Sequence, residues 1–94
     1  RIINLHPSLL PKFPGAHAVR DALASGATET GSTIHVVDAG VDTGPVIAQQ
    51  SMAILAGIGE HELHEQIKEI EKQQLVRTIE AIANGELKLE EVGT

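Results

Sequence analysis

Apolar and polar positions predict three strands in this chain. Residues 1–5 form a short, mostly apolar run that suits a buried strand. Residues 30–37 alternate, placing Ile34 and Val36 on one face and leaving the other face partly polar. An apolar pattern resumes over 45–55 after a segment dense in turn formers. The second and third strands are therefore expected to be neighbours joined by a shaped loop.

Two further segments favour helix. Residues 16–25 are rich in Ala and are bounded by Gly15 and Gly26, which suit helix ends. A long amphipathic helix is expected between Gly59 and residue 84, because apolar residues recur there at helical spacing. These apolar residues are Leu63, Ile67, Ile70, Leu75, Ile79 and Ile82. The order strand, helix, strand, strand, helix indicates an α/β fold, and a short strand at 87–89 is a further expectation.

Composition bounds the size and class of the protein. The 94 residues make at most one domain, and a chain of this size buries only about 60–65% of its unfolded surface, so its stability alone is expected to be marginal. Cys is absent and Phe13 is the only aromatic residue, so neither disulfides nor large rings supplement the core. The formal net charge of -6 argues against a nucleic-acid partner. No apolar run approaches the roughly 20 residues that span a bilayer, and we expect a soluble, cytoplasmic protein without a membrane partner.

Asn4 and His6 carry the most suggestive chemistry. They lie two positions apart on an extended segment, so both side chains point from one face of the strand. An amide donor beside an imidazole suits the stabilisation of a carbonyl oxygen that becomes an oxyanion, as in acyl transfer. Asp42 lies in a glycine-flanked turn that can return its carboxylate over the end of the sheet. There it would orient His6 or accept a proton.

Each of these residues also has a simpler interpretation. Asp42 alone is typical of a turn former, and single histidines are more often solvated or buried and satisfied than catalytic. His17 is placed to cap the helix beside it, and His35 to hydrogen-bond inside the sheet. His61 and His64 lie among glutamates on an acidic helix face, which is typical of a solvated surface. No metal site is therefore expected there.

Two blocks of sequence resemble a known family. Residues 4–15, Asn-Leu-His-Pro-Ser-Leu-Leu-Pro-Lys-Phe-Pro-Gly, resemble the signature of folate-dependent formyltransferases, and their three prolines predict a stiff loop. Residues 31–37 followed by 42–49 resemble the family's second signature at the expected distance. The turn at 13–15 followed by His17 is similar to the branch that acts on glycinamide ribonucleotide. The resemblance covers nearly the whole chain and implies the C-terminal half of a Rossmann-like domain, an open mixed sheet flanked by helices, without its N-terminal phosphate-binding half.

The resemblance implies a role for each position that matches the family's motifs. Asn4, His6 and Asp42 match the catalytic trio, which acts without a metal. The implied reaction transfers a formyl group from 10-formyltetrahydrofolate to the amine of glycinamide ribonucleotide in purine biosynthesis. The loop that binds folate would comprise Asp38, Ala39, Gly40, Val41 and Asp42. The ribonucleotide would contact Pro7, Ser8 and Glu71. His17 and His35 would lie behind the residues that contact the substrates and help to position them.

Other interpretations stay open beside this one. A sister folate-dependent formyltransferase or a formyltetrahydrofolate deformylase shares the trio but not the amine. A noncatalytic folate-binding or assembly module would keep only the folate loop. Because the phosphate-binding loop would lie upstream, the 94 residues alone are expected to bind substrate weakly or not at all. Their exposed sheet edge is expected to meet the missing N-terminal half or a second copy of the chain.

Overall fold

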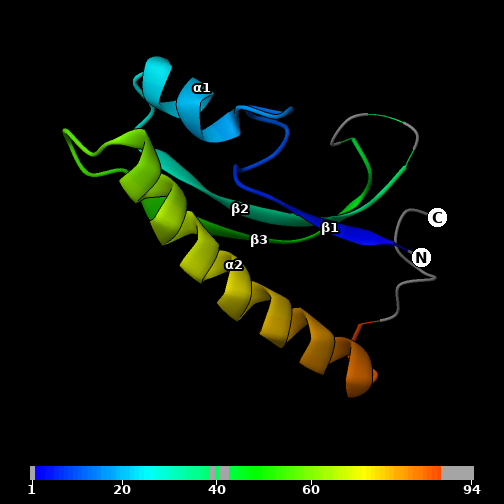
Figure 1. Ribbon diagram of the computed structural model, residues 1–94. Helices are drawn as coiled ribbons and strands as arrows, with labels where there is room; N and C mark the ends of the chain where they lie inside the picture. Colours follow the sequence, from blue (N-terminus) through cyan, green and yellow to red (C-terminus); the bar gives the residue numbers. More distant parts are fainter. Residues whose placement is uncertain (1, 39, 41–42, 88–94) are drawn as a thin grey trace.

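The described part of the chain folds into three strands and two helices in the predicted order. In this computed structural model, residues 2–38, 40 and 43–87 are described. The elements are strand β1 (Ile3–His6), helix α1 (Ala18–Ala24), strand β2 (Glu29–Val36), strand β3 (Val46–Ala53) and helix α2 (Glu60–Ala83), shown in Figure 1. The predicted α/β class is confirmed, and each element lies within a few residues of its predicted range. The short strand expected at 87–89 falls mostly outside the described residues.

The strands form one sheet in the order β1-β2-β3. β1 pairs with β2 so that Asn4 lies opposite His35 and His6 lies opposite Thr33. The pairing of β2 with β3 has an irregularity between Ile34 and His35, and bulges of this kind are common beside active sites. Every pairing among the described strands is antiparallel. The parallel pairings of the expected mixed sheet stay a prediction.

The sheet has a helix face and a loop face. α2 lies along the helix face (Figure 1), where the amide of Gln74 exchanges hydrogen bonds with Ser32 of β2. Side chains alternate along a strand, so His6 and Thr33 project from the opposite face. On that loop face the segment after β1 folds back over β2, and the backbone amide of Leu10 donates to Thr33 Oγ1 at 3.1 Å.

A small core forms where α1, α2 and the sheet meet. Val19 of α1 packs with Leu63 and Ile67 of α2, and both α2 residues are fully buried. Burying an aliphatic side chain of this size stabilises the fold by about 1.5–3 kcal/mol. Partly buried apolar residues complete the cluster: Leu23, Met52, Ile54 and Ile58.

The buried face of α2 differs from the predicted one in its C-terminal half. Ile79 is 54% exposed, whereas Gln74 and Thr78 are buried. With about 3.6 residues per turn, Leu63 and Ile67 share a line with positions 74 and 78, and Ile79 lies one position beyond that line. The apolar pattern therefore located the helix correctly, but the expectation that Ile79 lies on its buried face was wrong.

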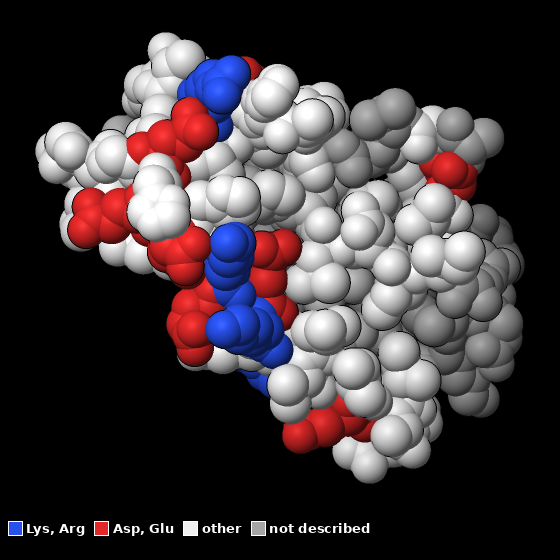
Figure 2. All heavy atoms as spheres, viewed as in Figure 1, with Lys and Arg blue, Asp and Glu red and all other residues white. Residues whose placement is uncertain are grey.

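Charged side chains gather along α2, as Figure 2 shows. Two ion pairs join neighbouring turns of this helix: Lys68 with Glu65 at 3.2 Å and Lys72 with Glu69 at 3.9 Å. Exposed pairs of this kind stabilise a protein by about 0–1 kcal/mol, so they mark the solvent side of the helix more than they strengthen it. Within the described ranges, no helix has the length and apolar character needed to cross a membrane.

Candidate active site

Strand β1 positions the two side chains expected to act in catalysis. Asn4 and His6 project from the loop face of the sheet, and their cross-strand neighbours His35 and Thr33 project from the same face. Asn4 is exposed, whereas His6 and His35 are 4% and 3% exposed. Side chains directly opposite each other on an antiparallel pair have Cβ atoms about 4.5–5.5 Å apart. The register therefore brings one amide and two imidazoles together.

The loop after β1 holds the imidazole of His6. Its Nε2 lies 2.8 Å from the carbonyl oxygen of Phe13, a distance at which Nε2–H donates to that oxygen. A protonated imidazole carries an N–H at both ring nitrogens. Phe13 has a φ of 51°, an uncommon backbone conformation for a residue with a side chain. Local backbone strain thus accompanies the placement of His6.

Ser8 and Thr33 fix this loop on the sheet. The fully buried hydroxyl of Ser8 donates to the carbonyl oxygen of Lys12 at 2.6 Å. The hydroxyl of Thr33 donates to the carbonyl oxygen of Ser8 at 2.7 Å. It also accepts from Leu10 N–H at 3.1 Å and from Gln49 Nε2 at 3.0 Å. The Ser8 hydroxyl is thus engaged within the loop, and a contact between Ser8 and substrate stays a prediction.

Sequence reasoning missed Thr33 and Gln49. Gln49 Nε2 also donates to the carbonyl oxygen of Leu10 at 2.7 Å, so both side chains tie the loop to the sheet. Thr33 and Gln49 are direct partners across β2 and β3. Alternation over residues 30–37 placed Thr33 on the partly polar face, but nothing in the sequence pattern indicated which segment would cover that face or that Gln49 would contact it.

The turn after β2 is built around Asp38. Its Oδ1 accepts hydrogen bonds from Gly40 N–H at 2.8 Å and from Thr43 Oγ1 at 2.9 Å. At Gly44, an added Cβ would lie 1.6 Å from the carbonyl oxygen of Val36, so only glycine fits there. Three residues of the expected folate loop lie outside the described residues: Ala39, Val41 and Asp42. The catalytic role of Asp42 therefore stays a prediction.

Glu71 of α2 lies beside β1, on the helix face of the sheet. It lines a shallow hollow of about 280 Å³ with Leu5, Lys68, Lys72 and Leu75. Partial burial raises the pKa of the Glu71 carboxyl, and the positive charges of His64, His6 and Lys68 partly oppose this shift. The hollow that it shares with Leu5 places Glu71 beside β1. Lys68, one turn before Glu71 on the same helix, was not singled out from the sequence.

A small cavity lies between the loop after β1 and the two helices. It has a volume of about 110 Å³, and its walls include Pro7, His17 and His64. His17 occupies the N-cap position of α1 but its side chain makes no capping hydrogen bond, so the interpretation of His17 as a side-chain cap was wrong. His64, interpreted above as a solvated surface residue, faces the same space as Pro7.

The side chains of Asn4, His6 and His35 can form hydrogen bonds, and the two imidazoles can also transfer protons. The Nδ1–H of His35 donates to the carbonyl oxygen of Val36 at 3.2 Å, which agrees with hydrogen bonding inside the sheet. In the described part of the chain, no group of three His, Cys, Asp or Glu residues is arranged to hold a metal ion. The amide of Asn4 and the imidazole of His6 suit a reacting group bound at the end of β1, where an oxygen gains negative charge.

An α/β sheet that carries an amide and an imidazole on one strand face fits the class of proteins that stabilise a developing oxyanion. Comparison with known proteins narrows this class. The model of the family described as "Formyl transferase" matches residues 1–79. The chain belongs to that family.

The names of similar proteins refer to the same substrate. Phosphoribosylglycinamide formyltransferase of Mycobacterium tuberculosis (strain CDC 1551 / Oshkosh) is 54% identical over 83 residues, which make up 88% of this chain and 39% of that protein. The protein of the same name from Escherichia coli (strain K12) is 40% identical over 91 residues, 97% of this chain and 43% of that protein. The crystal structure of glycinamide ribonucleotide transformylase 1 from Symbiobacterium toebii superposes with a TM-score of 0.89 at 42% identity, covering 98% of this chain and 44% of that one. The chain thus spans less than half the length of these relatives.

Proposed function

We propose that the protein to which this chain belongs transfers a formyl group from 10-formyltetrahydrofolate to the amine of glycinamide ribonucleotide in purine biosynthesis. The observation that carries the proposal is the placement of Asn4 and His6 on one strand face, with His35 directly across from Asn4. The names of the M. tuberculosis and E. coli relatives support glycinamide ribonucleotide as the acceptor.

In the proposed reaction, the amine attacks the formyl carbon and the formyl oxygen gains negative charge. Asn4 Nδ2–H and an N–H of protonated His6 donate to that oxygen. The bond between the formyl carbon and the folate nitrogen then breaks. The amine loses one proton and the folate nitrogen gains one. Asp42 is proposed to orient His6 and to move this proton through a bound water.

The two substrates are proposed to bind on either side of this chemistry. Backbone groups of the turn around Asp38 and Gly40 would meet the folate, since Asp38 already uses its carboxylate to shape that turn. Pro7, Ser8 and Glu71 would meet the ribonucleotide. Glu71 is suited to this role because a carboxylate accepts hydrogen bonds from sugar hydroxyls and because it lines a hollow beside Leu5 of β1.

The test is formyl transfer by this chain when it is supplied with the N-terminal part of the M. tuberculosis relative. His6→Asn is expected to lower kcat by about 10²–10³-fold, because one donor to the developing oxyanion is lost. His61→Asn changes an exposed histidine of α2 and is the matched control, with kcat expected to stay unchanged. Full activity of the His6 variant, or an equal loss in both variants, would contradict the assignment of His6.

The choice of acceptor separates the alternative functions. In the same assay, faster formyl release to water than to glycinamide ribonucleotide would identify a deformylase, and transfer to charged tRNA would identify a sister formyltransferase. Folate binding without any turnover in the supplemented protein would identify a noncatalytic module. We expect glycinamide ribonucleotide to be the preferred acceptor.

The outer edge of β1 is the proposed contact for the rest of the protein. Among the described strands β1 pairs with β2 alone, and Ile2 beside it is 72% exposed. A strand edge with an apolar neighbour favours pairing with another strand, either from the N-terminal part or from a second copy. The chain by itself is expected to bind either substrate weakly, and the cytoplasmic location also stays a prediction.

A further inference from the structure

We propose that a cavity between β3 and the C-terminal half of α2 binds a small carboxylate with an apolar body. The cavity has a volume of about 300 Å³, at the lower end of the roughly 300–1,000 Å³ typical of small-molecule sites. It lies on the helix face of the sheet, whereas Asn4 and His6 project from the loop face. The site is separate from the proposed formyl transfer and does not depend on it.

Arg77 gives this cavity a positive charge that no anionic side chain among the described residues pairs with. Its Nη2 donates to Gln50 Oε1 at 2.8 Å and its Nε donates to the carbonyl oxygen of Gln73 at 3.4 Å, both of which are neutral groups. Within the described residues Arg77 forms no ion pair. None of the described residues that line the cavity is acidic, although the chain has 13 Asp and Glu residues. A guanidinium has five N–H donors, so the remaining ones are available to an anion.

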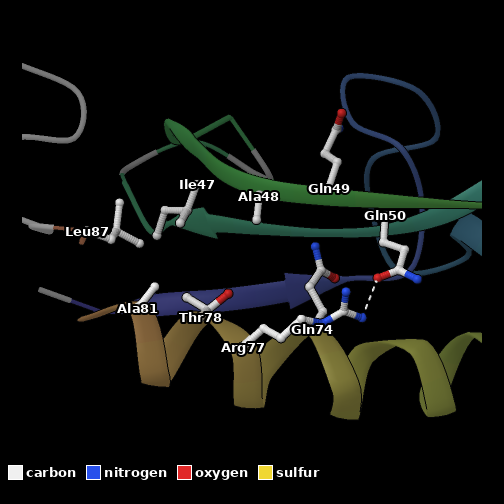
Figure 3. A pocket seen from close by; sticks show the side chains of 9 residues that line it. All are labelled: Ile47, Ala48, Gln49, Gln50, Gln74, Arg77, Thr78, Ala81 and Leu87. Carbon is white, nitrogen blue, oxygen red and sulfur yellow. Dashed lines mark hydrogen bonds between the residues drawn. The ribbon is translucent and has the colours of Figure 1, made fainter. Parts of the chain in front are cut away.

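Neighbouring polar groups hold the guanidinium across the cavity. Figure 3 shows Arg77 extending from α2 to Gln50 of β3, with the hydroxyl of Thr78 pointing from α2 toward the sheet. The bond to Gln50 reduces the number of conformations that Arg77 samples, which lowers the entropy that binding must overcome. A guanidinium held in this way suits the planar, two-oxygen geometry of a carboxylate.

The other end of the cavity is apolar. Ile47 and Ala48 of β3, together with Ala81 and Leu87, line the part away from Gln50 (Figure 3). A ligand with its carboxylate at Arg77 would place a short hydrocarbon chain against these side chains. A phosphate would instead bring charged oxygens toward an apolar wall, which is unfavourable without further donors. The lining therefore favours a carboxylate with an apolar body over a simple inorganic anion.

The experiment is an NMR titration of the chain with sodium butyrate at constant ionic strength. We expect saturable shifts of the Arg77 Nε–H resonance and of the backbone amides of 47–50. Arg77→Gln is expected to weaken binding by about tenfold or more, the effect of losing a charge-assisted pair. Arg20→Gln is the matched control, because Arg20 lies on α1 and already pairs with Glu60 at 3.3 Å; butyrate binding should be unchanged in this variant.

Two further comparisons test the apolar part of the site. Ala81→Leu is expected to fill the cavity and weaken butyrate binding while the amide spectrum keeps its native dispersion. Inorganic phosphate and n-butanol are each expected to bind at least about tenfold more weakly than butyrate, because each lacks one of the two features. Equal binding of phosphate and butyrate, unchanged binding in Arg77→Gln, or shifts that never saturate would overturn the proposal.

Discussion

At the scale of single residues, two threonines on β2 show how position decides the role of a side chain. The fully buried hydroxyl of Thr33 makes three hydrogen bonds that tie the loop after β1 to the sheet. Thr30 lies three positions earlier and is 2% exposed, but its hydroxyl has no hydrogen-bond partner among the described groups. The two residues have the same chemistry and comparable burial, so they form an internal comparison.

Thr33→Val is expected to destabilise the chain. The substitution keeps the shape of the side chain but leaves the buried N–H of Leu10 and the carbonyl oxygen of Ser8 without this partner. Each buried group left unsatisfied costs about 1–3 kcal/mol, so we expect a loss of about 2–4 kcal/mol. Thr30→Val should leave stability unchanged or increase it. Urea denaturation of both variants provides the measurement, and similar losses at the two positions would contradict the assigned role of Thr33.

Glu71→Gln is expected to change how stability depends on pH. Burial raises the pKa of Glu71 in the folded chain, so the folded state binds the proton more tightly than the unfolded state. This contribution to stability is present below the unfolded pKa and is lost as pH rises through the folded pKa. The parent chain should therefore lose stability relative to Glu71→Gln as the pH rises above about 4.3, the ordinary pKa of a Glu carboxyl. Urea midpoints measured at increasing pH test it, with Glu69→Gln, whose side chain is 66% exposed, as the control.

At the scale of elements, local sequence predicted the strands and helices well. Alternation located β2, and helical spacing located α2, because each pattern follows from the geometry of a single element. The buried line of α2 was harder to predict in its second half, because Gln74 is buried only by virtue of its hydrogen bonds to Ser32 of another element. A polar residue that is satisfied across a tertiary contact leaves no trace in the hydrophobic pattern.

The N-cap position of helix α2 offers a way to increase the stability of the chain. Gly59 is its N-cap residue, with extended backbone (φ -80°, ψ 162°) and no side-chain cap. An added Cβ would meet nothing within 4 Å. Gly59→Ser would form a capping box with Glu62 and is expected to stabilise the chain by about 0.5 kcal/mol. Gly59→Ala fills the same space without a hydroxyl; an equal gain from Ala in thermal unfolding would show that capping is not the cause.

At the scale of the whole molecule, the sequence predicted which residues share a strand face but not what lies around them. The spacing of Asn4 and His6 places them together on β1, since the period of a strand is two. The position of His35 across from Asn4 depends on the register between two strands, and the hydrogen bond from His6 to Phe13 depends on the path of a long loop. The first contact joins residues far apart in sequence and the second depends on the fold of a loop without regular structure, so no hydrophobic pattern contains either of them.

The position of β1 at the edge of the sheet has a consequence for the proposed activity. This strand has four residues and, in the described part of the sheet, pairs along one edge only. A short strand at the edge of a sheet detaches in local openings that require much less free energy than global unfolding. Mild denaturant would therefore release Asn4 and His6 while α2 keeps its helical signal. Inactivation would then precede unfolding, and a tightly docked partner strand would bring the two transitions together.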